Sequence, residues 1–237
     1  MVWGTFTLTH ILTLVLGAAL LLGLYFILRN KDRKTQTLVL GILSFLGYAA
    51  IFYELLFKGN VLANLPLHLC SINAMILPFV VFTRNKTFGN LLLVWCLGAL
   101  AALVLNYDPA GESIFTWNVF FYYFPHLVEF GIPLLLVALG HVKKDPKCII
   151  STVAISMVIY TIVHFLNLLI IKTTGFEANY MFSMRPNNPL VDLFYSWIPH
   201  TYWYMYLVLP IVVVYLLIVY APEIIRSIKN KKAAKVA

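Results

Sequence analysis

The chain has 237 residues, of which 62% are hydrophobic and 11% are charged, and its formal net charge is +8. Soluble domains are roughly 25% charged, so this composition excludes a water-soluble globular protein and indicates helices that span a membrane. The three cysteines, Cys70, Cys96 and Cys148, lie apart in apolar segments, which excludes a disulfide framework and a CxxC metal site. We therefore predict an all-α polytopic membrane protein that forms a single domain over residues 1–237.

Apolar runs between charged clusters predict seven transmembrane helices in chain order. They cover residues 8–28, 36–57, 65–83, 88–105, 118–140, 148–171 and 201–221. The longest connection, 172–200, is expected to form a lid or a re-entrant element, and its PLVDLFYSWI stretch (189–198) to form a short interfacial helix. Residues 222–237 are predicted to form a basic tail.

The basic residues lie almost entirely on one side of this predicted topology. Fourteen of the seventeen fall in the connections 29–34, 84–86 and 143–147 and in the tail. The positive-inside rule makes that side cytoplasmic, with the N-terminus outside and the C-terminus inside. Since these charges then lie near anionic lipid headgroups, membrane lipids are the expected partners and nucleic acid is not.

The same topology gathers ionisable and polar side chains in the outer half of the membrane. An ionisable group at the centre of a spanning helix costs roughly 2.5 to 3.5 kcal/mol on insertion scales. Each ionisable residue within a span therefore calls for a structural or functional explanation. The layer predicts a polar cavity that opens toward the outer leaflet or toward the extracytoplasmic water. Its members are His10, Glu54, His68, Cys70, His126, Glu129, His164, Asn167 and His200.

Some members of the layer have structural interpretations. His10 fits an interfacial residue, His200 fits an aromatic belt beside Trp197, and Glu54 can reach outward from its helix end. The deeper group cannot be explained as belt residues, and we predict that it forms a functional site. It comprises His126, Glu129, His164 and Asn167.

Cys70 is the candidate nucleophile. It follows Pro66, expected in the first helical turn, where the positive end of the helix dipole favours the thiolate. His68, two residues away, faces nearly the opposite side of a regular helix and is therefore a poor base. We assign His68 a supporting role, and we assign a supporting role to Asn73 as well. Spacing leaves the choice of base open between His164 and His126, and we favour His164.

Each candidate base has a polar neighbour three residues further along its helix. Asn167 follows His164, and Glu129 follows His126. The combination of cysteine, histidine and an orienting polar group is typical of thiol acyl transfer. Histidines and carboxylates can also bind zinc, but the chain has no HxxxH or HExxH spacing, so no cofactor or metal is expected.

Three blocks resemble a known family. LPLHLCSIN (65–73), HFLN (164–167) and NYMFSMRP (179–186) are similar to signature blocks of the YwaF family of bacterial membrane proteins, which also contains the animal transmembrane protein 164. The animal member is described as a cysteine-dependent phospholipid acyltransferase. The resemblance implies that Cys70 is the nucleophile, that His164 is the histidine, and that the protein lies in a bacterial plasma membrane.

The substrate contacts are expected in the third block and just before the last helix. Arg185, one of three basic residues on the outer side, can hold a lipid phosphate or can simply anchor its loop. Asn179, Tyr180 and His200 complete the expected binding residues.

The predicted function is a membrane-embedded acyltransferase that uses a cysteine thioester in the outer half of the membrane, or a lipid hydrolase if water is the acceptor. The alternatives are a zinc-dependent membrane hydrolase and a protein that binds or transports a small solute, ion or metal. A transporter should continue its polar groups toward the cytoplasm, whereas the inner half of every predicted span is apolar.

Overall fold

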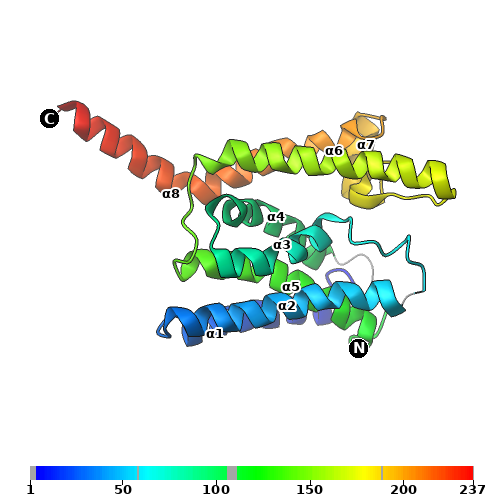
Figure 1. Ribbon diagram of the computed structural model, residues 1–237, viewed down its shortest axis with the longest axis horizontal. Coiled ribbons are helices and arrows are strands. Elements are labelled where there is room, and N and C mark those ends of the chain that lie inside the picture. The colour runs from blue at the N-terminus through cyan, green and yellow to red at the C-terminus, as the bar shows by residue number, and fades with distance from the viewer. Residues whose placement is uncertain (1–3, 58, 106–110, 188, 237) are drawn as a thin grey trace. The chain divides into compact units, whose positions relative to one another are not determined.

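The computed structural model describes residues 4–57, 59–105, 111–187 and 189–236, and all regular structure in these ranges is helical. The chain divides into two compact units, Met1–Val142 and Lys143–Ala237, here called the first and second units. The first unit holds α1 (Leu8–Leu28), α2 (Arg33–Phe57), α3 (Leu69–Thr83), α4 (Lys86–Leu105) and α5 (Trp117–Ala138) (Figure 1). The prediction of a single domain stays a prediction.

The described residues confirm a protein with several membrane-spanning helices. Six helical stretches are long and apolar enough to cross a bilayer: α1, α2, α4, α5, α6 (Cys148–Thr174) and the stretch Trp203–Ile228. At 15 residues α3 is shorter, roughly 22 Å against a hydrocarbon core of about 30 Å. A seventh span and the orientation of the two termini remain predictions.

The predicted start of the third helix at residue 65 is wrong, because α3 begins at Leu69. Pro66 disfavours helical backbone at Leu65, and the Leu67 amide donates to the Leu65 carbonyl at 2.7 Å in a tight turn instead. Pro66 therefore lies before the helix, which moves Cys70 into its first turn.

Two further helix predictions can be compared with the structure in the C-terminal part of the chain. The short helix predicted at residues 189–198 is present as α7 (Pro189–Trp197). The last helix does not end at 221 as predicted, since α8 runs from Val208 to Val236 and includes most of the predicted basic tail.

In the first unit α5 is the central helix, because it packs against α1, α2, α3 and α4. Three glycines permit close approach at two of these contacts, α1 with α5 and α2 with α5. Gly131 of α5 receives the side chain of Leu21, Gly17 of α1 lies against Tyr123, and a Cβ added at Gly47 of α2 would lie 2.9 Å from Val128. Close packing of this kind is usual where membrane helices associate.

In the second unit α6 supports the connection that precedes the last span. This connection contains η1 (Tyr180–Phe182) and α7, and it is followed by η2 (Trp203–Leu207). Val191, Phe194 and Tyr204 form a buried apolar cluster that packs α7 against η2. The Tyr160 hydroxyl of α6 donates to the Tyr202 carbonyl at 2.8 Å. The predicted lid is therefore packed in this structure.

A buried histidine joins the ends of α1, α2 and α5. The side-chain amide of Gln36 donates to the carbonyls of Leu28 and Lys31, at 2.9 and 3.1 Å. Its oxygen therefore faces Nε2 of His141 at 2.8 Å, and since that oxygen only accepts, His141 carries a proton on Nε2. Arg33 adds a bond of 2.6 Å to the Leu139 carbonyl.

We predict that His141 makes stability depend on pH. Burial, together with the nearby charges of Arg33 and Arg84, lowers the pKa of His141 from 6.5 to about 4. The unfolded chain therefore binds a proton at a pH where the folded chain does not. Folding stability should be full above pH 6.5 and fall as the pH drops toward 4.

The measurement is the midpoint of thermal unfolding in detergent between about pH 7.5 and about pH 4, for the wild type and His141→Gln. The variant should lose less stability over this range, because it lacks the titrating group. The control His200→Gln removes an exposed histidine and should keep the wild-type dependence. Equal losses in wild type and His141→Gln would contradict the prediction.

Candidate functional site

Cys70 is the second residue of α3, and its side chain is half-buried. His68 is the N-cap residue of this helix, and its side chain makes no capping hydrogen bond. The N-terminus of a helix carries a partial positive charge, which stabilises negative charge on a sulfur in the first turn. The sequence prediction placed Cys70 near a helix N-terminus, and the structure confirms this position.

The structure brings Cys70 together with His126 and Glu129 of α5. The Cys70 sulfur, a ring nitrogen of His126 and a carboxylate oxygen of Glu129 all lie within 4.8 Å of one another. Glu129 is 2% exposed, so its carboxyl group is enclosed by protein. These three residues form a Cys–His–Glu cluster within the first unit, with Cys70 on α3 and His126 and Glu129 on α5.

A backbone carbonyl fixes the proton position on His126. Nδ1 of His126 lies 2.6 Å from the carbonyl oxygen of Tyr122, and because a carbonyl only accepts, Nδ1 carries the proton. Nε2 is then the basic nitrogen. Tyr122 is itself held by a bond of 2.9 Å from its hydroxyl to the Ala102 carbonyl of α4. Tyr122 was not singled out in the sequence, although its position one turn before His126 is a signal for such a contact.

Two buried polar residues on the helices that carry the cluster have unused hydrogen-bonding capacity. Asn73, one turn after Cys70 on α3, is 1% exposed. Among the described residues, neither polar atom of its amide has a partner, and the same holds for Oε2 of Glu129. Buried polar atoms in proteins are normally paired, so these atoms indicate a place for a polar ligand group.

A second polar cluster lies in the second unit. Nδ1 of His164 is 3.1 Å from the hydroxyl oxygen of Ser183, to which the Asn167 amide donates at 2.8 Å. Asn167 also donates to the Tyr180 carbonyl and accepts from the Tyr180 amide, at 2.9 and 3.0 Å. Asn167 thus fastens η1 to α6. The preference for His164 as the base remains a prediction, while the structure places His126 beside Cys70.

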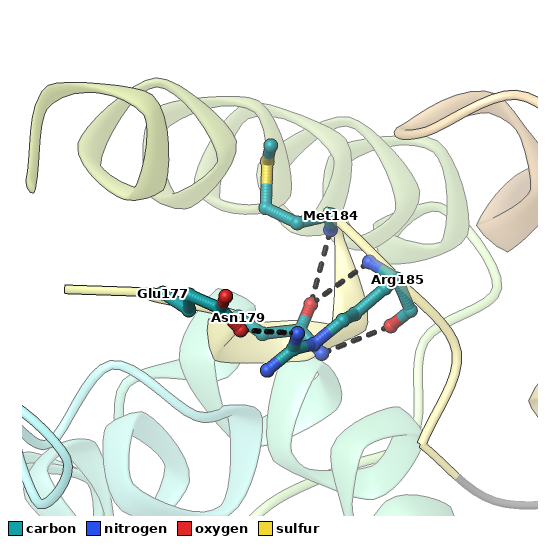
Figure 2. A network of polar contacts seen from close by, with 4 residues as sticks. All are labelled: Glu177, Asn179, Met184 and Arg185. Atoms are coloured by element: carbon teal, nitrogen blue, oxygen red, sulfur yellow. Dashed lines mark hydrogen bonds and ion pairs between the residues drawn. The ribbon is translucent and has the colours of Figure 1, made fainter. Parts of the chain in front are cut away.

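Arg185 takes part in the loop network shown in Figure 2. Its guanidinium lies 2.5 Å from a carboxylate oxygen of Glu177, in an ion pair whose side chains are largely exposed. The Asn179 side chain accepts from the amides of Met184 and Arg185, both at 3.1 Å, and donates to the Arg185 carbonyl at 2.9 Å. Exposed ion pairs contribute little free energy, so this pair holds Arg185 only weakly. A contact between Arg185 and a lipid phosphate remains a prediction from the sequence.

The remaining residues of the predicted polar layer and binding site differ in burial and in hydrogen bonding. The Tyr180 side chain is buried, and burial raises the pKa of its phenol. His200 is exposed. His10 has a structural role, since its Nε2 donates to the Leu103 carbonyl at 2.8 Å and its Nδ1 accepts from the Phe6 amide at 3.0 Å. The side chain of Glu54 lies outside what the structure describes.

The comparisons with known proteins identify the family. The sequence model of the TMEM164 family matches residues 5–220, which is nearly the whole chain. The chain belongs to the TMEM164 family. This agrees with the resemblance found in the sequence blocks around Cys70 and His164. A search of curated proteins and a search of solved structures found no match.

We predict that Cys70 is the most reactive of the three thiols in this TMEM164 family member. Cys96 and Cys148 are buried, whereas Cys70 is half-buried and has a base beside it. Peptide mass spectrometry after brief alkylation should find Cys70 modified first, and His126→Asn should slow its modification several-fold. If His164→Asn slows it instead, the histidine favoured by the sequence is the base.

Proposed function

We propose that the protein is a membrane-embedded acyltransferase in which Cys70 takes an acyl chain from a phospholipid ester as a thioester. The observation that carries this proposal is the approach of the Cys70 sulfur, a His126 nitrogen and a Glu129 oxygen to within 4.8 Å of one another. A thiol with an adjacent base, oriented by a third group, is the arrangement that nucleophilic catalysis requires. The family resemblance of the block around Cys70 supports the same chemistry.

In the first half-reaction Nε2 of His126 takes the proton of the Cys70 thiol. The thiolate attacks the carbonyl carbon of the ester, a C–S bond forms, and the carbonyl electrons move to the oxygen. When this intermediate collapses, the C–O bond to the glycerol breaks and the leaving alkoxide takes the proton from His126. The products are an acyl thioester on Cys70 and a lysolipid.

In the second half-reaction the hydroxyl of an acceptor lipid gives its proton to His126 and attacks the thioester carbonyl. The C–S bond breaks, and Cys70 recovers the proton. With water as the acceptor the same steps make a hydrolase. Glu129 is buried beside the histidine, where a carboxylate balances the positive charge that His126 gains in each half-reaction.

The predicted topology puts this cluster in the outer half of a bacterial plasma membrane, close to the depth of phospholipid esters. Distances of up to 4.8 Å exceed a hydrogen bond. Catalytic hydrogen bonds are often long without substrate and shorten when it binds. Membrane lipids thus serve as donor and acceptor in this proposal, and Arg185 is the candidate contact to a lipid phosphate.

The second candidate function is a zinc-dependent membrane hydrolase, and the same cluster favours it. Catalytic zinc sites use three protein ligands plus water, and a thiolate, an imidazole and a carboxylate within 4.8 Å provide such a set. The bond from His126 to the Tyr122 carbonyl is also the usual partner of a zinc-bound histidine. In this function Cys70 is a ligand, and no acyl-enzyme forms.

Intact-protein mass spectrometry separates the two functions. Purified protein is incubated with phospholipid, with and without a zinc chelator, and compared with Cys70→Ala. We expect a mass increase of one acyl chain that hydroxylamine removes, that Cys70→Ala lacks and that the chelator does not affect. Lipid turnover that the chelator abolishes, without any adduct, would replace the acyltransferase by the zinc hydrolase.

The identity of the base gives a further prediction. His126→Asn should slow adduct formation by about 10²- to 10⁴-fold, the usual contribution of a general base. His164→Asn is the matched comparison, because it removes the other candidate histidine. Adduct formation should depend much less on His164 than on His126, and the opposite order would refute the assignment of His126.

A further inference from the structure

Asn73 differs from the other buried amide and hydroxyl side chains of the first unit. Gln36, Ser44 and Asn90 are all buried and all donate a hydrogen bond to a backbone carbonyl. Asn73 is equally buried, at 1% exposure, yet neither its amide nitrogen nor its amide oxygen has a partner among the described residues. A primary amide is therefore kept inside an apolar helical unit without the bonds that would offset its loss of water.

The place of Asn73 points to a ligand of the reactive cluster. Residues three apart lie on the same side of a helix, so Asn73 is one turn beyond Cys70 on the same side of α3. The cluster shows that α5 approaches α3 at Cys70, and α5 contributes His126 and Glu129. The unpartnered Oε2 of Glu129 is a second buried polar atom there.

Catalysis at Cys70 creates a need for a hydrogen-bond donor. When the sulfur attacks an ester, the carbonyl oxygen becomes negatively charged, and in an apolar site this charge requires preorganised donors. The positive end of α3 supplies part of this stabilisation, since its N-cap side chain makes no capping hydrogen bond. A side-chain amide is the kind of donor that serves this purpose in acyl transfer.

We propose that the Asn73 side-chain amide donates a hydrogen bond to the carbonyl oxygen of the acyl group that Cys70 attacks. The bond strengthens as negative charge develops on that oxygen, so Asn73 acts mainly in the transition state and only weakly in ground-state binding. This inference rests on the proposed function, because it needs an acyl group at Cys70. It assigns the unpartnered amide a ligand group that is present only when substrate is bound.

The test compares Asn73→Leu with Asn90→Leu. Leucine has nearly the shape of asparagine without its polar atoms, and Asn90 is a buried asparagine whose amide donates to the Lys86 carbonyl at 2.7 Å. The readouts are the saturating rate of thioester formation, the lipid concentration that gives half this rate, and the thermal midpoint without lipid.

We expect Asn73→Leu to lower the saturating rate by about 10²- to 10³-fold, the usual effect of removing one such donor. The half-saturating concentration should change little. Asn73→Leu should unfold at the wild-type temperature or above, because it removes an unpaired buried amide. Asn90→Leu should show the reverse pattern, a lower thermal midpoint with a rate close to wild type.

The outcomes separate this inference from the proposed function. If the wild type forms a thioester and Asn73→Leu forms it at the same rate, the role of Asn73 is refuted and the acyltransferase stands. If Asn73→Leu loses rate and thermal stability together, as a merely structural residue would, the inference is also refuted. If the wild type forms no thioester at all, the proposed function fails, and this inference fails with it.

Discussion

The absence of water inside a bilayer is the constraint on which the rest of this structure depends. A polar group there must find its partner within the protein, which is why the chain crosses the apolar region as helices. The same constraint explains the side-chain contacts of His10, Gln36 and Asn167, each of which bonds to the backbone of another element. It also makes the unpartnered atoms of Asn73 and Glu129 informative, since few groups can remain unpaired in such surroundings.

The central position of α5 connects this constraint to the Cys–His–Glu cluster. This helix contacts four others, partly through glycines that let their neighbours approach closely. It presents His126 and Glu129 one turn apart, and its own Tyr122 carbonyl holds the histidine with Nε2 available as a base. The cluster is thus built on packed helices, which position side chains more firmly than loops do. The chemistry proposed at Cys70 depends on how α3 packs against α5.

In the second unit the polar groups also need partners within the protein, and there they find them. Here Asn167, Ser183 and the Tyr180 backbone satisfy one another, and they hold a loop that also contains the Asn179 and Arg185 network. These residues carry two of the three sequence blocks that resemble the family, and their contacts show how such blocks can hold a backbone in place. A role of His164 or Arg185 toward substrate remains a proposal from the sequence.

The sequence by itself determined the helical membrane class, most helix boundaries, the family, and Cys70 as the candidate nucleophile. These follow from local hydrophobicity, from turn chemistry and from short motifs, which are properties of neighbouring residues. It could not decide between His126 and His164, because spacing along one helix says nothing about which helices touch. Only the tertiary structure placed His126 and Glu129 beside Cys70 and left the Asn73 amide buried with no partner among the described residues, since both depend on how α3 packs against the other helices of the first unit.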